Sequence, residues 1–284
     1  MLFKTILLLF YRFNKVNFSK NILIILSLLL SYSAQAQYHE VGVQGGVASY
    51  IGDLNNQIFA PKFGAVGGAF YRKNFTPHFA WRTNLNVGRF SFDSKWSKSE
   101  YIQYQNLNFR NTITEAVTMI EFNFFKYKAN RDSKALWSPY IFWGGGFAYY
   151  YLDAKYDNKH VYLPGKRTEG KDYVPFIFTM PFGGGLKFNV AKSITFSMEC
   201  MYHHTYTDYL DDVNSTYIQK KITNGKNPTN IADPSNTNNI LSDVKNKQRG
   251  DQFKDKYFFV MLSLSYTFFT PHCPNPDSED SFDK

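Results

Sequence analysis

From Tyr38 onward, hydrophobic and polar residues alternate with a period of two, a pattern that is typical of β-strands. Polar or turn-rich stretches divide this alternation into eight segments, and no helical run competes with them. The predicted strands cover about 38–50, 63–72, 79–92, 112–127, 137–151, 175–189, 193–205 and 257–269. The chain is therefore expected to be all-β.

The connections between these segments alternate in length. Short connections lie at 73–78, around Asp132 and at 190–192, and long polar ones at about 52–62, 93–111, 152–174 and 206–256. Bacterial outer-membrane barrels combine short periplasmic turns with long outer loops, and eight is their smallest usual strand number. We therefore predict an eight-stranded antiparallel outer-membrane β-barrel of OmpA or OmpX size, with both of its ends on the periplasmic side.

The alternation also gives each strand two faces. In the last segment Leu262 and Leu264 share one parity, whereas Ser263 and Ser265 share the other. A membrane barrel turns its large apolar residues toward lipid and its small or polar residues toward the lumen, whereas a soluble barrel does the reverse. Parity alone does not distinguish a membrane barrel from a soluble barrel, so the choice depends on other features of the sequence.

Aromatic residues near the strand ends favour the membrane barrel over aromatic pairing in a soluble sandwich. Tyr and Trp prefer a membrane boundary because part of the ring is apolar and part can bond to water. The rings assigned to these boundaries are Tyr38, Tyr50, Phe63, Tyr71, Phe79, Trp81, Phe90, Phe92, Tyr127, Trp137, Tyr149, Tyr151 and Tyr257. Aromatic residues make up 19% of the 284 residues, and we expect most of them to point outward.

The N-terminal residues 1–36 have the three parts of a signal peptide. Basic residues precede an apolar block at 22–30, and Ala34-Gln35-Ala36 forms a small-residue cleavage site before Gln37. An uncleaved anchor is disfavoured because the apolar block is shorter than the roughly 20 residues that span a bilayer. The predicted organisation is a leader at 1–36, a barrel at 37–269 with a long surface loop at 206–256, and a periplasmic tail at 270–284.

Charge excludes one class of partner. Removal of the leader takes away four basic residues and lowers the formal charge from +9 to +5. The remaining basic residues are scattered, which does not support binding to nucleic acid.

Five charged residues fall on the parity assigned to the lumen. They are Arg82, Glu115, Glu121, Lys187 and Glu199. They could form an ion or proton path, but the interior of an eight-stranded barrel is only wide enough for side chains. Paired charges that fill the lumen are therefore the favoured interpretation.

Candidate chemistry is weak elsewhere. His203 and His204 could serve a lipid hydrolase or a metal site, but no nucleophile lies at a required spacing, and adjacent strand residues face opposite sides. We therefore predict no catalytic, cofactor or metal residues. Asp208, Asp211 and Asp212 could bind calcium, but a hydrogen-bonded knot that fixes the start of the last loop is favoured.

The tail after the last strand is a candidate partner contact. Its residues Thr270, His272, Cys273 and Pro274 follow the aromatic end of the barrel. Cys273 could form an intermolecular disulfide or remain an inert thiol.

An ordered set of strings gives a more specific indication than any single motif. The strings are Ile51-Gly52-Asp53-Leu54-Asn55, Ile120-Glu121-Phe122-Asn123-Phe124-Phe125, Ser138-Pro139-Tyr140-Ile141-Phe142, Thr207-Asp208-Tyr209-Leu210-Asp211-Asp212-Val213 and Gln248-Arg249-Gly250. Together they resemble the PorG family of outer-membrane barrels in the type IX secretion and gliding system of Bacteroidetes.

This resemblance implies a function that the residue pattern alone does not. A PorG-like barrel would sit in outer-membrane lipid, contact a periplasmic ring of the PorK/PorN type and other type IX components, and carry out no catalysis. The alternatives are a passive small barrel or adhesin and a lipid-modifying barrel enzyme.

Overall fold

The computed structural model describes the chain from 38 to 269 with gaps. The described ranges are 38–55, 62–126, 136–156, 158–191, 193–217, 233–235, 247–250 and 254–269. The predicted signal peptide at 1–36, the tail at 270–284 and much of the loop at 206–256 lie outside them. Among the described residues, no helix combines the length and the apolar content needed to cross a membrane.

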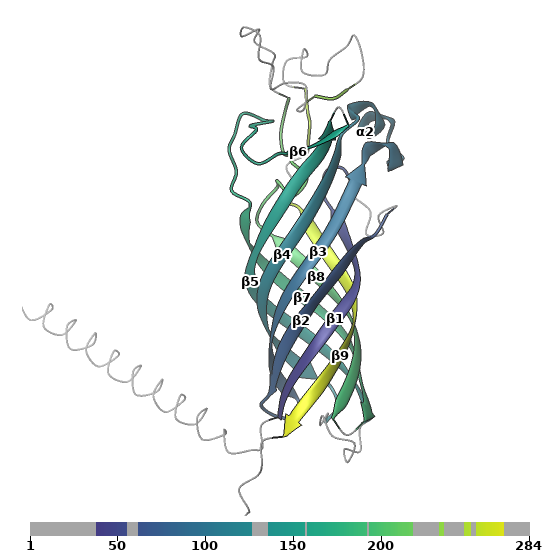
Figure 1. Cartoon of the computed structure of the whole chain (residues 1–284), viewed down its shortest axis with the longest axis vertical. Coiled ribbons are helices and arrows are strands. Elements are labelled where there is room, and N and C mark those ends of the chain that lie inside the picture. Colours follow the sequence, from purple (N-terminus) through teal and green to yellow (C-terminus); the bar gives the residue numbers. More distant parts are fainter. Residues whose placement is uncertain are drawn as a thin grey trace, which may run out of the picture. The chain divides into compact units, whose positions relative to one another are not determined.

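Nine antiparallel strands make up the fold, and eight of them close into a barrel (Figure 1). The strands are β1 (Tyr38–Ile51), β2 (Gly64–Asn74), β3 (Phe79–Asp93), β4 (Asn108–Asn123), β5 (Trp137–Tyr156), β6 (Lys159–Tyr162), β7 (Phe176–Ala191), β8 (Ile194–Thr205) and β9 (Lys256–Phe269). Their order is β4-β3-β2-β1-β9-β8-β7-β5, and β4 pairs with β5 to close the ring. The predicted eight-stranded antiparallel barrel is confirmed.

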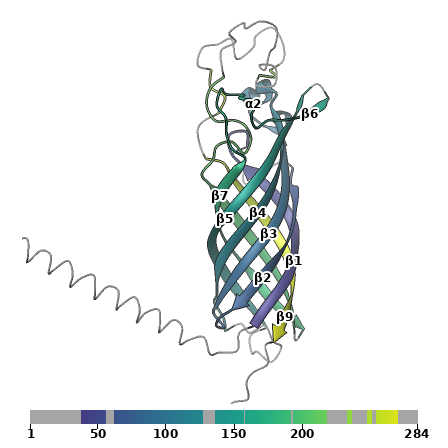
Figure 2. The same ribbon diagram turned by 60° about the vertical axis from the view of Figure 1, so that its left-hand side comes forward.

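The ninth strand lies outside the ring. β6 pairs only with the last residues of β5, from Asp153 opposite Tyr162 to Tyr156 opposite Lys159, and the hairpin projects beyond the barrel (Figure 2). The structure also places two short helices, η2 (Ser94–Trp96) and α2 (Glu100–Gln105), in the loop before β4. These elements were not predicted, because none is long enough to show a periodic pattern.

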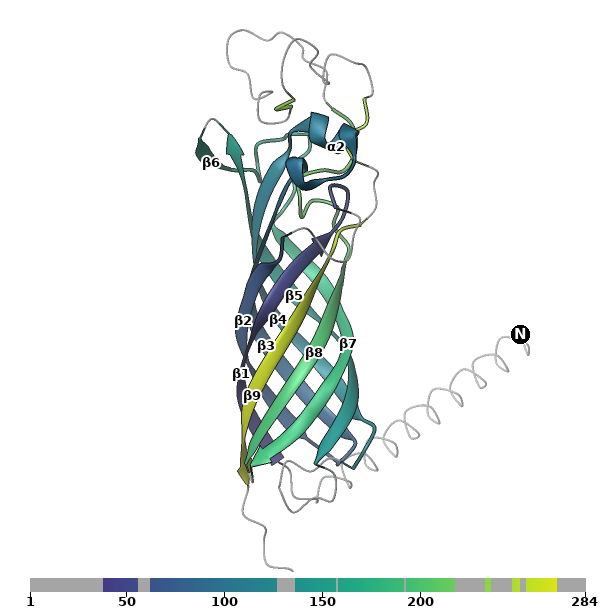
Figure 3. The same ribbon diagram turned by 90° about the vertical axis from the view of Figure 1, so that its right-hand side faces the viewer.

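The two ends of the barrel differ. At one end β2 and β3, β4 and β5, and β7 and β8 are joined by the shorter connections, and we call this the short-turn end. The other end, which carries η2, α2, β6 and the long loops, is the long-loop end (Figure 3). β1 begins at the short-turn end, where Tyr38 lies opposite both Asn74 and Phe269.

The two faces follow the predicted parity. Trp143 is 62% exposed and Leu262 is 51% exposed on the outside, whereas Ser263 and Ser265 are buried inside. Large apolar side chains outside and polar side chains inside invert the arrangement of a soluble barrel. The closed ring also leaves no unpaired backbone edge, which lipid would not tolerate. This is the architecture of a transmembrane β-barrel.

Four of the predicted boundary rings are instead inside the barrel. Tyr50, Phe90, Phe92 and Tyr257 are all buried, and they pack together near the long-loop end with Phe109. The ring centroids of Tyr50 and Phe90 lie 5.8 Å apart. The expectation that these four face a membrane boundary is wrong, because each has the parity of the lumen.

The other boundary rings have a different placement. Phe63, Tyr71, Phe79, Trp137, Tyr149 and Tyr151 are exposed on the outside, and Trp81 is half-buried. Tyr127 lies outside the described residues. Phe258 shares the parity of the exposed Val260 and Leu262, yet it is buried.

Some interior positions require glycine because the backbone of the neighbouring strand and a large side chain occupy the space beside them. A Cβ atom at Gly183 would lie 2.0 Å from the carbonyl oxygen of Cys200 and 2.8 Å from the ring of Phe142. Gly45, in contrast, lies on the outer face, where the nearest atom to such a Cβ is 3.7 Å away.

We predict that Gly183→Val destabilises the barrel by about 1–3 kcal/mol, the usual cost of overpacking. Gly45→Val is the matched control and should leave stability nearly unchanged. Urea unfolding in lipid vesicles measures both. Equal stability of the two variants would contradict the tight packing at Gly183.

Candidate functional site

The half of the lumen nearer the short-turn end holds six charged side chains, which we call the ion-pair network. Its members are Glu40, Arg72, Arg82, Glu121, Lys187 and Glu199, which come from β1, β2, β3, β4, β7 and β8. Arg82 lies between two acids, with Nε 2.9 Å from Glu121 and Nη1 2.7 Å from Glu199. Glu121 also accepts Lys187 Nζ at 2.5 Å.

The network is balanced in charge, with three acids and three bases. Arg72 joins it to β1 through Glu40 at 2.7 Å and contacts Glu121 at 2.9 Å. All six side chains are buried, and a buried charge is tolerated only when it is paired and hydrogen-bonded.

Neutral side chains complete the network. Tyr140 from β5 donates to Glu199 at 2.5 Å, and Ser265 from β9 donates to Glu40 at 3.0 Å. With these two, every strand of the barrel contributes a polar side chain to one connected cluster. The cluster spans the lumen from strand to strand at this level, and the interior of an eight-stranded barrel is only wide enough for side chains.

A second polar cluster lies closer to the long-loop end. His203 Nε2 lies 3.1 Å from a carboxylate oxygen of Glu115, which also accepts the Tyr257 hydroxyl at 2.6 Å and the Asn86 amide at 2.9 Å. The His203 ring stacks on Tyr257 with centroids 4.2 Å apart. The buried rings of Tyr50 and Phe90 come next toward the long-loop end, where the ring centroids of Phe90 and Tyr257 lie 6.3 Å apart.

The structure brings together four of the five predicted lumen charges. Arg82, Glu121, Lys187 and Glu199 share the ion-pair network, whereas Glu115 belongs to the His203 cluster. Sequence reasoning missed Glu40 and Arg72. Their parity was available as a signal, because Glu40 alternates with the outward-facing Val41 and Val43.

His203 and His204 face opposite sides of β8. His203 is buried in the lumen, whereas His204 is half-buried on the outer face and meets Tyr206 edge-on at 5.2 Å. The two rings therefore do not share a site. The exposed Cys200 also faces outward.

The predicted aspartates form part of a buried cluster at the long-loop end, which we call the loop knot. Tyr50 donates to Asp211 and, at 3.1 Å, to Asp255. Asp211 accepts the Val213 amide at 2.9 Å, and Asp255 accepts the Leu210 amide at 2.8 Å. These bonds fix the start of the last loop to the end of β1.

Arg249 provides the second half of the loop knot. Its guanidinium contacts Asp212 at 3.2 Å and Glu169 at 3.0 Å, and it donates to the backbone carbonyl of Asp212. Glu169 in turn accepts the Ser215 amide at 3.0 Å. Three separate loop segments therefore meet in one cluster.

Two other residues belong to the surroundings of the loop knot. Asp208 is also buried at the start of this loop, and Gln105 of α2 donates to the Arg249 carbonyl at 3.1 Å. Sequence reasoning missed Glu169 and Asp255. Arg249 was visible only as part of the string that resembles the PorG family.

Burial changes the acidity of the loop knot. It raises the pKa of Asp211 from 3.8 to about 7. Burial, together with repulsion from Asp211, raises the pKa of Asp255 well above its ordinary value. Among the described residues, no group of three or more His, Cys, Asp and Glu side chains is arranged to hold a metal ion.

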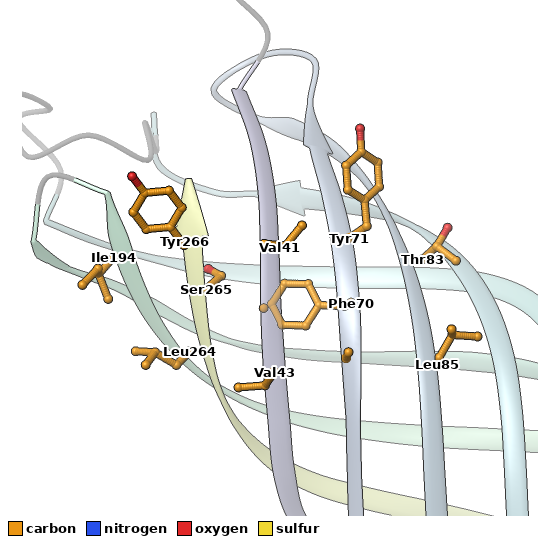
Figure 4. A pocket seen from close by; sticks show the side chains of 12 residues that line it. Val41, Val43, Phe70, Tyr71, Thr83, Leu85, Ile194, Leu264, Ser265 and Tyr266 are labelled. Carbon is orange, nitrogen blue, oxygen red and sulfur yellow. The ribbon is translucent and has the colours of Figure 1, made fainter. Parts of the chain in front are cut away.

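An apolar groove lies on the outer face near the short-turn end (Figure 4). Val41 and Val43 of β1, Tyr71 of β2, Leu85 of β3 and Leu264 of β9 are among its lining residues. The groove belongs to the surface that would face acyl chains. The predicted partner-contact residues Thr270, His272, Cys273 and Pro274 lie outside the described residues.

A comparison with protein families identifies the chain. Residues 19–230 match the family model described as a domain of unknown function, DUF6089. The chain belongs to the DUF6089 family. That match covers the predicted barrel through β8 and into its longest loop.

Several solved structures resemble this DUF6089 chain. Ail of Yersinia pestis is 11% identical with a TM-score of 0.41, and the match covers 82% of this chain and all of Ail. OprG of Pseudomonas aeruginosa is 10% identical with a TM-score of 0.45, and the match covers 84% of this chain and 98% of OprG. The outer membrane enzyme PagL is 10% identical with a TM-score of 0.29, over 80% of this chain and 98% of PagL.

Part of the DUF6089 chain is similar to SaeR from two strains of Staphylococcus epidermidis. The response regulator SaeR of Staphylococcus epidermidis is 26% identical over 150 residues, which are 49% of this chain and 63% of SaeR. The chain thus spans less than two thirds of the length of this relative.

We predict that Arg82→Met costs about 3–5 kcal/mol of stability, because it leaves buried carboxylates without a partner. The double variant Arg82→Met/Glu199→Gln should recover part of that loss. Arg167→Met, which breaks an exposed pair with Asp172, is the control and should show no measurable change. Urea unfolding in vesicles measures all three, and equal effects at Arg82 and Arg167 would contradict the account of the network.

The loop knot should be more stable at pH 5 than at pH 8. Because the pKa of Asp211 is about 7 in the folded protein, against 3.8 ordinarily, the folded state binds more protons between these values. Its stability therefore falls as the pH rises through this window.

Hydrogen exchange at the Leu210 and Val213 amides, corrected for intrinsic rates, measures this change. Asp211→Asn should weaken the pH dependence, whereas Asp172→Asn, at an exposed site outside the loop knot, should leave it intact. Protection that increases from pH 5 to pH 8 would contradict the sign.

Proposed function

We propose that this protein is a non-enzymatic outer-membrane component of the type IX secretion system that contacts a periplasmic ring of the PorK/PorN type. The ordered strings that resemble the PorG family support this assignment. The signal peptide predicted at 1–36 and the apolar outer face support a place in the outer membrane.

The filled lumen is the observation that carries the proposal. The ion-pair network and the His203 cluster place buried, mutually paired side chains in the interior. Such a barrel offers no route for a folded or unfolded polypeptide. Its function must therefore lie in its two ends and its outer face, which suits an assembly component better than a channel.

The short-turn end offers a surface for the ring. Phe75, Phe125 and Trp137 are exposed there, and Phe125 meets Trp137 edge-on at 5.2 Å. Lys126 is exposed beside them, and Lys73 Nζ lies 5.5 Å from the centroid of Phe75. In the predicted orientation this end faces the periplasm, together with the tail at 270–284.

We predict that the tagged full-length protein, extracted from its own cells in mild detergent, brings down the ring lipoprotein and its partner. The double variant Lys73→Glu/Lys126→Glu should reduce their recovery about tenfold, because reversed charge opposes a contact at the short-turn end. A chain that ends at Phe269 tests the predicted contribution of the tail. Quantitative mass spectrometry measures the recovery.

The double variant Lys98→Glu/Lys166→Glu is the control, since both lysines are exposed at the long-loop end. It should bring down the ring as the wild type does. Absence of ring subunits from the wild-type sample would contradict the proposed function. Loss of the ring only in the control would contradict the orientation.

A further inference from the structure

The outer face of the barrel changes from apolar to basic toward the long-loop end. On β3, the exposed Leu85 and Val87 are followed on the same face by the exposed Arg89. On β8, Met198 and Cys200 face outward below His204. These basic groups lie at the edge of the apolar surface, where a bilayer has its headgroups.

A compact basic group lies on β8, β9 and the residues beside them. We call His204, Lys254, Lys256 and Tyr206 the rim cluster. His204 and Lys256 lie directly opposite each other in the pairing of β8 with β9. Lys254 Nζ lies 5.0 Å from the centroid of the Tyr206 ring, so Tyr206 has a cationic group on its face and His204 at its edge.

Within the part of the chain that the structure describes, the bases of the rim cluster have no acidic partner on the outer face. Among the described residues, His204, Lys254 and Lys256 make no ion pair. The acid between the two lysines, Asp255, is buried and turned toward Tyr50. Alternation along the chain therefore separates opposite charges: the carboxylate of Asp255 lies inside the barrel, and the ammonium groups of Lys254 and Lys256 lie outside.

An apolar wall lies directly next to these charges. The Tyr206 hydroxyl donates to Met180 Sδ at 2.9 Å, and the Tyr206 ring stacks on Phe178 with centroids 6.2 Å apart. Farther along β7, the exposed Phe182 packs against Tyr202 at 4.8 Å. The surface thus combines a compact cationic group with an apolar strip that continues into the membrane-facing band.

We propose that the rim cluster binds a phosphorylated glycolipid of the outer leaflet, of the lipid A class. Its phosphate would lie among the His204, Lys254 and Lys256 side chains, and an acyl chain would lie along Phe178 and Phe182. Charge-assisted bonds to phosphate favour this ligand over a neutral lipid. The apolar strip favours it over a soluble anion, which would make no contact with the exposed side chains of Phe178 and Phe182.

The site is separate from the short-turn end, so this proposal does not depend on ring binding. Native mass spectrometry of the purified full-length mature barrel in detergent tests it with three probes: bisphosphorylated lipid A, the same lipid without phosphates, and inorganic phosphate. The triple variant His204→Gln/Lys254→Gln/Lys256→Gln should bind the phosphorylated lipid about tenfold more weakly. The triple variant Lys95→Gln/Lys98→Gln/Lys155→Gln, at exposed positions of the long-loop end, should bind it as the wild type does.

Each outcome decides for or against the site. Unchanged binding by the rim variant, or equal binding of the lipid without phosphates, would overturn the proposal. So would competition by inorganic phosphate at concentrations equal to those of the lipid, which would indicate a simple anion site. Heat-modifiable migration in gels verifies that each variant has folded, so that weaker binding reports on the site itself.

Discussion

The structure depends on the pairing of charges inside a space that is only as wide as the side chains within it. Backbone closure creates that space, and strand alternation directs three acids and three bases into it. Each charge then depends on partners from other strands, as Arg82 does on Glu121 and Glu199. The pairing that offsets the cost of burying these charges also places their side chains across the lumen.

Because side chains occupy the interior, the two ends and the outer face are the surfaces left for binding other molecules. The loop knot ties three loop segments across the long-loop end, and the rings of Tyr50 and Phe90 pack beneath it. The short-turn end instead presents exposed rings and lysines. The barrel therefore has two chemically different ends and a basic group at its long-loop rim.

Periodicity predicted the barrel and the placement of most side chains, because both follow from a period of two. Phe90 and Tyr257 have the parity of the lumen, but we predicted them at a membrane boundary. The preference of rings for membrane boundaries suggested otherwise for these two residues, and parity was the better guide. Contacts such as Arg249 with Glu169 could not be predicted, since they join loops that have no period and lie far apart in sequence. β6 and α2 are too short to leave a pattern.

The central claim is that side chains close the lumen, and conductance tests it most directly. The full-length mature protein, refolded into a planar lipid bilayer at neutral pH, should show no steady current under an applied voltage. A steady current proportional to voltage in the wild type would contradict the filled interior. It would also remove the reason to assign the function to the two ends of the barrel.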